Sequence, residues 1–226
     1  MSIFFWAYLF LLKNPVFPVT IMPLTAVDRW IGFSPLALIP YLSLWIYCSL
    51  PVMLMPTRTR LLNFGVWIGL MCLLALSVFY WWPNAVPAAD IDWVRYPGVA
   101  FLKEVDAAGN ACPSLHVAAA VYASFWLYWL MRALRLGWRT QLIQVVWGIA
   151  ILYSTMAIKQ HVSLDVLAGI VLGVVFAWMS RWFDHKFQPL SVSMVPLAVI
   201  PPGQHAVMDS TNGVTHSRLP LRAASK

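Results

Sequence analysis

Two short polar clusters interrupt an otherwise apolar chain, and each contains a histidine. The first covers residues 112–116, with the sequence CPSLH, and the second covers residues 159–165, with the sequence KQHVSLD. A histidine can act as a nucleophile or as a proton donor when neighbouring side chains orient and polarise it. The residue types in the two clusters therefore indicate chemistry on an anionic substrate, with phosphoryl transfer as the leading hypothesis.

The second cluster carries the groups that a covalent mechanism needs. His161 and Asp165 are four positions apart, so they share one face of any helix that begins near His161. A carboxylate that accepts a hydrogen bond from one ring nitrogen fixes the tautomer and leaves the other nitrogen free to attack phosphorus. Lys159 adds a cation that can neutralise phosphate oxygens. Because an acid inside an apolar segment is costly, Asp165 is a functional candidate in its own right.

The first cluster resembles an anion-binding helix start. Ser114 precedes a long apolar segment and is a good N-cap, which places backbone N–H groups and the positive end of the helix where they can bind phosphate. His116 falls in the first helical turn, where it can donate a proton to a leaving oxygen. A capping serine or an interfacial histidine is commonplace when it occurs alone. Two histidines, an acid and a lysine on one side of an apolar protein favour a functional site.

The composition points to a membrane protein. Of 226 residues, 61% are hydrophobic and 10% are charged, against roughly 25% charged in soluble domains. The 13 tryptophans, the 8 tyrosines and the net charge of +7 suit two membrane interfaces and anionic lipid head groups. The basic residues are dispersed, which argues against a nucleic-acid partner. The 3 cysteines show no metal-ligand spacing, and we expect no disulfide framework.

Apolar runs of about 20 residues predict an all-α, polytopic membrane bundle with six transmembrane helices. The N-terminus shows no cleavable signal, and prolines interrupt the first run. Residues 1–186 form the predicted membrane domain, with an outer loop at 83–113 that contains an interfacial helix near 98–108. Residues 187–226 are predicted to be a disordered cytoplasmic tail. The six predicted spans are residues 3–26, 35–55, 61–82, 114–134, 141–158 and 163–183.

Basic residues beside these spans predict the orientation. Lysine and arginine accumulate on the cytoplasmic side of a membrane. In this chain they flank three turns on one side: Arg58 and Arg60, then Arg132, Arg135 and Arg139, then Arg181 and Lys186. Both termini are therefore expected in the cytoplasm, and both histidine clusters are expected on the outer face.

The two clusters resemble the second and third motifs of the type 2 phosphatidic acid phosphatase superfamily over about residues 22–182. Residues 113–116 resemble Pro-Ser-Gly-His with leucine in place of glycine. Residues 154–165 keep the spacing of the third motif, Ser-Arg, five residues, His, three residues, Asp, with threonine in place of arginine. The leucine variant, the Lys-Gln-His run and residues 28–31 are similar to the branch that includes inositol phosphorylceramide synthase and related bacterial proteins.

The resemblance implies a role for each site residue. His161 is the expected nucleophile that forms a phosphohistidine, Asp165 orients it, and His116 protonates the leaving group. Ser114 and the adjoining amides bind phosphate oxygens, in addition to Lys159. The resemblance implies no metal and no other cofactor, a lipid phosphate or pyrophosphate as substrate, and a location in the bacterial inner membrane.

Two positions depart from the family pattern. Residues 82–89, which correspond to the first motif, contain no basic residue, and Thr155 replaces the arginine of the third motif. The cations left to hold an anion are Lys159 and, in the outer segments, Arg29, Arg95 and Lys103.

Three functions stay open at this point. The first is a lipid phosphate or pyrophosphate phosphatase or phosphotransferase. The second is a catalytically silent relative that binds anionic lipid head groups, as the missing arginines allow. The third, a small transporter or channel subunit, ranks last because the polar residues cluster at one interface and not at the membrane midplane.

Overall fold

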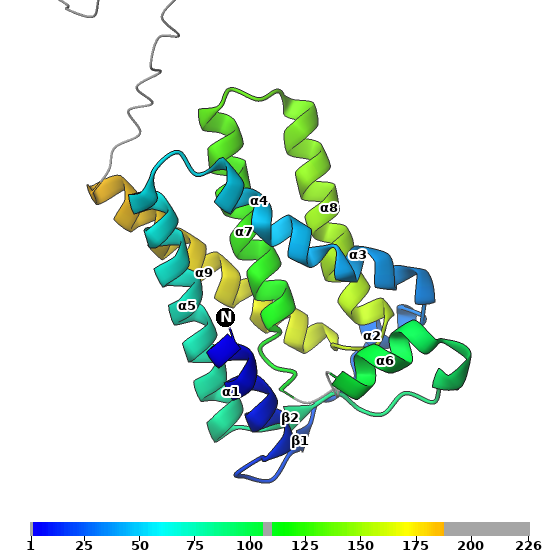
Figure 1. Ribbon diagram of the computed structural model, residues 1–226. Helices are drawn as coiled ribbons and strands as arrows, with labels where there is room; N and C mark the ends of the chain where they lie inside the picture. Colours follow the sequence, from blue (N-terminus) through cyan, green and yellow to red (C-terminus); the bar gives the residue numbers. More distant parts are fainter. Residues whose placement is uncertain (1, 106–109, 188–226) are drawn as a thin grey trace, which may run out of the picture. The chain divides into compact units, whose positions relative to one another are not determined.

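The computed structural model describes residues 2–105 and 110–187 (Figure 1). The predicted disordered tail lies outside the described residues, apart from Phe187, which ends the last helix. The elements in chain order are α1 Ser2–Lys13, β1 Thr20–Ile21, α2 Ala26–Trp30, η1 Pro35–Ala37, α3 Leu38–Leu42, α4 Leu44–Leu54, α5 Arg58–Trp81, β2 Asn84–Ala85, η2 Trp93–Arg95, α6 Pro97–Val105, α7 Leu115–Ala133, α8 Trp138–Ala157 and α9 Ser163–Phe187.

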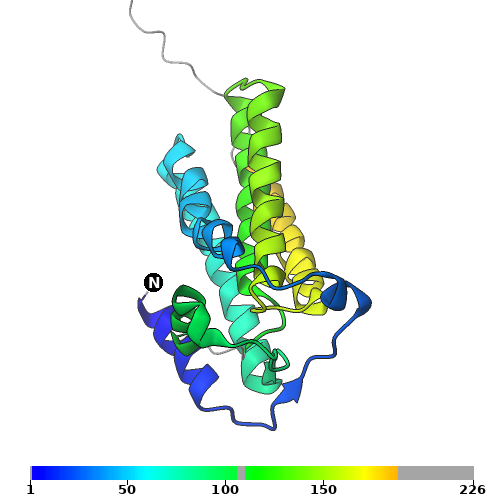
Figure 2. The same ribbon diagram turned by 90° about the vertical axis from the view of Figure 1, so that its right-hand side faces the viewer.

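Helix α7 is the centre of the bundle. It packs against α9, α8 and α4, while α5 packs against α9 and α3 against α8 (Figures 1 and 2). The face of α7 toward its neighbours alternates small and large residues, and Ala118, Tyr122 and Trp126 are among those almost completely buried. This central position brings the start of α7 beside the turn between α8 and α9. The two histidine clusters lie at that end.

Two glycines bring α9 unusually close to α7. A Cβ added at Gly169 would lie 2.6 Å from the backbone oxygen of Ser114, and one added at Gly173 would lie 2.6 Å from the backbone oxygen of Ala118. Small residues spaced four apart let helix backbones approach closely inside membranes. The close approach places the first turn of α7 against the first turns of α9.

Within residues 2–105 and 110–187, four helical segments are long and apolar enough to cross a membrane: Pro35–Leu54, Arg58–Trp81, Trp138–Ala157 and Ser163–Asp184. The described chain is thus largely helical, as predicted, and its four long apolar helices are compatible with an integral membrane protein, but the count of six spans is not confirmed. Helix α7 has 19 residues, and its Tyr, Trp and His side chains lower its mean hydropathy, so it does not belong to the four.

The predicted first span does not form one helix. Helix α1 ends at Lys13, and its 12 residues reach about 18 Å, short of the roughly 30 Å of a hydrocarbon core. Asn14 and three prolines follow, and the chain continues through β1 and the short α2. Proline lacks the N–H that a helix interior requires, which explains why the run breaks.

Strand β1 pairs in parallel with β2, with Thr20 opposite Asn84.

At the end of the bundle away from the histidine clusters, a buried ion-pair cluster joins α5 to α9. Asp184 lies 3.3 Å from Nε of Arg60 and 2.7 Å from a terminal nitrogen of Arg181. All three side chains are largely buried. Two of the arginines that predict the orientation are therefore also structural residues.

Candidate active site

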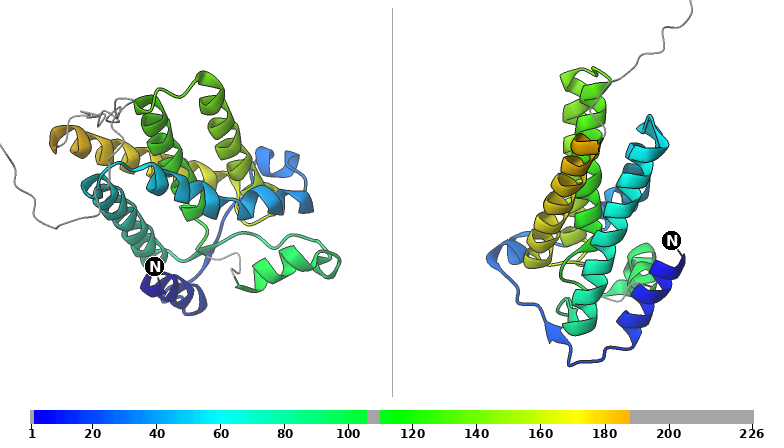
Figure 3. Two further views of the ribbon diagram at one scale, coloured as in Figure 1. Left: turned by 45° about the horizontal axis from the view of Figure 1, so that its top comes forward. Right: turned by 90° about the vertical axis from the view of Figure 1, so that its left-hand side faces the viewer.

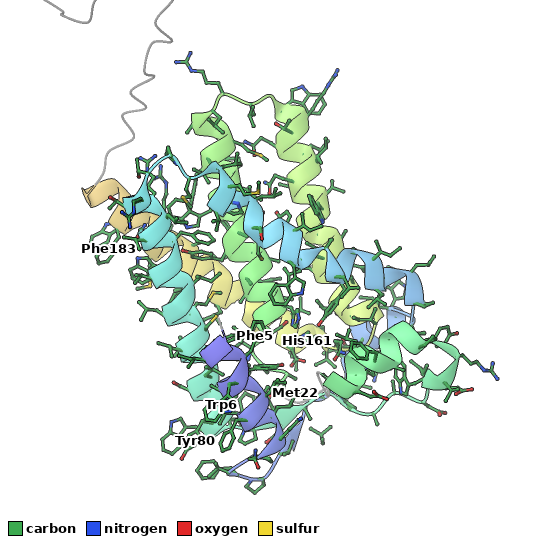
Figure 4. All side chains as sticks on the ribbon, in the orientation of Figure 1. Phe5, Trp6, Met22, Tyr80, His161 and Phe183 are labelled. Atoms are coloured by element: carbon green, nitrogen blue, oxygen red, sulfur yellow. The ribbon has the colours of Figure 1, made fainter. Side chains whose placement is uncertain are left out.

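His161 and Asp165 form a buried pair at the start of α9. Nδ1 of His161 lies 3.6 Å from Oδ2 of Asp165. Oδ2 also accepts a hydrogen bond of 3.0 Å from the backbone N–H of Val162, which fixes the carboxylate within the first turn. His161 is 8% exposed and Asp165 is fully buried. Helix α9 begins at Ser163, two residues after His161, so the turn before the helix brings His161 to Asp165, and the two residues do not share a helix face. Figure 4 shows His161 where α7 begins and α8 ends.

His116 lies next to this pair. Its ring centroid is 5.8 Å from that of His161, so the two histidines, 45 positions apart in the sequence, share one site. Nε2 of His116 shares a hydrogen bond of 2.8 Å with the hydroxyl of Tyr41. The two rings also stack, with centroids 4.8 Å apart. Tyr41, from α3, thus fixes the orientation of the His116 ring.

Ser114 joins the two motifs directly. Its side chain caps α7 by accepting a hydrogen bond from the N–H of Val117 at 3.3 Å, and its own N–H donates to the backbone oxygen of Asp165 at 3.2 Å. The chain before it is held by buried Asn84, whose side chain bonds both the N–H and the oxygen of Cys112, at 2.7 and 2.9 Å. The segment at the expected first motif therefore supplies a structural amide and no cation.

Lys159 contacts the protein backbone with its ammonium group. It lies at the C-terminus of α8 with a positive φ of 59°, and Nζ donates to the backbone oxygens of Ile31 at 2.6 Å and of Asp28 at 3.3 Å. These bonds use two of the three N–H donors of the ammonium. The prediction that Lys159 binds phosphate therefore rests on one remaining donor and on the charge.

The other candidate cations occupy separate positions. Arg95 forms an exposed ion pair of 2.9 Å with Asp92. Lys103, on α6, donates to the backbone oxygen of Lys159 at 2.9 Å and lies over the ring of Trp93. Arg29 is exposed on α2.

Thr155, at the position of the family arginine, serves to end α8. Its hydroxyl donates to the backbone oxygen of Leu152 at 2.8 Å. Its own backbone oxygen accepts hydrogen bonds from the N–H groups of Gln160 and His161, at 3.0 and 3.1 Å. Thr155 thus helps to place His161 but brings no charge to the site.

The arrangement suits nucleophilic and acid–base chemistry. The nitrogen of His161 that faces Asp165 is Nδ1, which leaves Nε2 as the nitrogen able to attack an electrophile. His116 supplies a second imidazole, whose ring centroid is 5.8 Å from that of His161, and the start of α7 supplies a helix N-terminus. In the described part of the chain, no three His, Cys, Asp or Glu side chains come together as a metal ion requires.

Some residues of the site were beyond sequence reasoning. Tyr41 is 75 positions from His116, and no local signal links them. Asp28 entered only through the resemblance, although its carboxylate contacts the start of α9. Gly169 and Gly173 did carry a signal, because small residues four apart in an apolar segment favour close helix packing.

Comparison with known proteins identifies the family. Residues 61–189 match the family model of the PAP2 superfamily. The matched residues run from the first turn of α5 past the end of the described chain and include both histidine motifs. No curated protein and no solved structure matches the chain. The match does not distinguish the narrower branch that the residues around Asp28 predict. Because it covers more than half of the sequence and both motifs, this chain belongs to the PAP2 superfamily.

Proposed function

We propose that the protein is a lipid phosphate or pyrophosphate phosphatase, or a phosphotransferase, that acts through a phosphohistidine at His161. The observation that carries the proposal is the convergence of the His161–Asp165 pair and His116, with 5.8 Å between the two imidazole centroids. PAP2 membership supports a phosphatase-type activity on lipid phosphates. The residues around Asp28 support the inositol phosphorylceramide synthase-like branch, which contains transferases as well as phosphatases.

The proposed reaction has two halves. Nε2 of His161 attacks phosphorus, and the bond from phosphorus to the leaving oxygen breaks while His116 gives that oxygen a proton. Asp165 holds the ring and stabilises the cation that forms on it. Water or a lipid alcohol then attacks phosphorus, the bond from phosphorus to Nε2 of His161 breaks, and His116 accepts the proton of the attacking hydroxyl group. Ser114, the N–H groups at the start of α7 and Lys159 stabilise the phosphate oxygens.

An apolar groove supports a lipid as substrate. It has a volume of about 580 Å³ and runs along α9 beside α5, with Leu74, Val171 and Phe176 in its lining. One end is formed by Pro113 and Leu164, the immediate neighbours of Ser114 and Asp165. A hydrocarbon chain in this groove would place its head group at the histidines.

The distribution of charge supports an active site on the outer leaflet. The turn between α7 and α8 and the start of α5 carry arginines, and both lie at the end of the bundle away from His161 (Figures 3 and 4). By the positive-inside rule that end faces the cytoplasm. The proposal therefore places the chemistry on the outer side, and the resemblance to bacterial proteins makes a bacterial inner membrane the proposed location.

The direct test is incubation of purified protein with a panel of lipid phosphates and pyrophosphates. Free phosphate and new phospholipids are followed by mass spectrometry, which separates hydrolysis from transfer. We expect product from wild-type protein, inhibition by vanadate, and none from His161→Ala or Asp165→Asn. Product from His161→Ala at the wild-type rate would contradict the mechanism.

The second candidate is a silent relative that binds anionic lipid. It is favoured by the engagement of Lys159 and Lys103 with backbone oxygens, which leaves few cations for catalysis. Lipid binding that persists in His161→Ala, with no turnover by wild-type protein on any substrate of the panel, would support this candidate over the enzyme.

A further inference from the structure

The residue that precedes helix α9 has no side chain able to cap it. The first residue of α9 is Ser163, and the residue before it is Val162, which cannot accept a hydrogen bond through its side chain. The first N–H groups of a helix have no partner within the helix and are normally capped by a Ser, Thr, Asp or Asn at the preceding position. The helix that carries Asp165 therefore depends on a cap from elsewhere.

Asp28, 135 positions earlier in the sequence, supplies that cap. Its Oδ1 accepts a hydrogen bond of 2.6 Å from the N–H of Ser163, and its Oδ2 accepts one of 2.9 Å from the Ser163 hydroxyl. Oδ2 also accepts from the N–H and the hydroxyl of Thr25, at 2.8 and 2.9 Å. Residue Asp28 is 7% exposed. Its two oxygens thus accept four hydrogen bonds, and two of these come from the start of α9.

The charge of Asp28 suits this position. Burial alone would raise the pKa of Asp28, but the hydrogen bonds from Thr25 and Ser163 outweigh burial and hold the pKa below its usual value. The side chain is therefore an anion at neutral pH. An anion at the N-terminus of α9 also interacts favourably with the helix dipole.

Lys159 makes the return contact. Its ammonium donates to the backbone oxygen of Ile31, the C-cap of α2, and to that of Asp28, the middle residue of this five-residue helix. A cation is favourable there for the same electrostatic reason that an anion is favourable at the start of α9. Asp28 and Lys159 thus join α2 to both ends of the turn that contains His161.

We infer that Asp28 is a positioning residue, which caps α9 from α2 and thereby holds His161 and Asp165 in their relative placement. Asp165 is only two residues beyond Ser163, and its Oδ2 bonds the N–H of Val162 within the same turn. Loss of the cap would let this turn move, and the separation of Nδ1 and Oδ2 would no longer be fixed. The catalytic consequence rests on the proposed function, whereas the structural consequence does not.

The test compares Asp28→Ala with Asp92→Ala, which removes the same charge from an exposed ion pair. Amide hydrogen exchange of residues 159–165 should be roughly five- to tenfold faster in Asp28→Ala and unchanged in Asp92→Ala. The kcat on lipid phosphate should fall roughly tenfold in Asp28→Ala, with KM within about twofold of wild type. Equal exchange in Asp28→Ala and wild type would overturn the inference, whatever the activity.

Two variants of Ser163 isolate the bond if Asp28→Ala does not fold. Proline is favoured at the first position of a helix, so Ser163→Pro removes the capped N–H without breaking α9. Ser163→Ala removes the hydroxyl and keeps that N–H. We expect Ser163→Pro to show the faster exchange and the lower kcat of the pair. Exchange as slow in Ser163→Pro as in Ser163→Ala would overturn the capping role. If wild-type protein has no activity, the exchange measurements still decide on the cap.

Discussion

The hydroxyl of Tyr41 lies 2.8 Å from Nε2 of His116, and the rings of the two residues stack with centroids 4.8 Å apart. Tyr41 is almost completely buried and comes from α3. The stacking and the hydrogen bond together restrict the ring to one orientation. The orientation of His116, the proposed proton donor, is therefore fixed by a residue outside both sequence motifs.

Tyr41→Phe should lower kcat while the fold is kept. The substitution retains the stacked ring and removes only the hydroxyl. A hydrogen bond contributes about 1 kcal/mol, so kcat should fall roughly fivefold with little change in KM. The matched control is Tyr128→Phe on the same helix as His116, where the hydroxyl accepts a bond from Arg132 far from the site. Steady-state kinetics that show equal kcat values for the two variants would contradict the role of Tyr41.

Ser114→Ala separates helix capping from phosphate binding. Thr57 caps α5 as Ser114 caps α7, with side-chain bonds of the same length, 3.3 Å, to the N–H three residues on. Thr57→Ala and Ser114→Ala should each reduce stability by about 1 kcal/mol. Only Ser114→Ala should reduce kcat/KM, by about tenfold or more, because the proposed function has its hydroxyl bind a phosphate oxygen as well. Thermal unfolding in detergent and kinetics provide the two readouts, and equal kcat/KM values in both variants would argue against phosphate binding.

Gly173→Ala should destabilise the bundle. The added methyl group would meet the backbone oxygen of Ala118 at 2.6 Å and Cβ of Val121 at 2.8 Å. Overpacking of this kind costs about 1–3 kcal/mol. Gly69→Ala in α5 is the control, because nothing lies within 4 Å of its added Cβ, and alanine favours the helix. Thermal unfolding should show a lower midpoint for the first variant alone; an unchanged midpoint would mean that α9 can move away from α7.

The glycine pairs of α5 and α9 show the limit of sequence reasoning about the fold. Gly65 and Gly69 in α5 have the same four-residue spacing as Gly169 and Gly173 in α9, yet only the α9 pair meets another helix backbone. The spacing indicates that a close approach is possible, and the three-dimensional packing decides where it occurs. The apolar runs predicted most helices, but the first run, residues 3–26, does not continue as one helix past Lys13, because the prolines that interrupt it in the sequence end the helix.

The sequence predicted the motif residues of the site but not the residues that hold them in place. His116, His161 and Asp165 follow from residue type and local spacing, and the structure brings them together. Tyr41 and Asp28 act across 75 and 135 positions, so only the folded chain reveals them. Charge alone suggested that lysines would face the substrate, but the backbone oxygens at helix ends compete for the same ammonium groups.

The groove beside α9 predicts a dependence on chain length. Val171→Trp places a large side chain in the groove, and Ile149→Trp places the same side chain on the exposed face of α8; the wild-type residues are 55% and 60% exposed. Exclusion of two methylene groups costs about 0.8 kcal/mol each, so KM for long-chain lipid phosphates should rise roughly tenfold in Val171→Trp. Water-soluble short-chain phosphates should be unaffected. A KM for long chains that stays at the wild-type value would exclude the groove as the tail site.

The central claim is that phosphorus becomes bonded to His161. The most direct measurement is rapid alkaline quenching of the protein during turnover of a lipid phosphate with a labelled phosphoryl group, followed by peptide mass spectrometry. We predict label on Nε2 of His161 in wild-type protein and no label in His161→Ala. Turnover of the lipid phosphate with no labelled histidine at any time point, or with the label on another residue, would contradict the proposed mechanism.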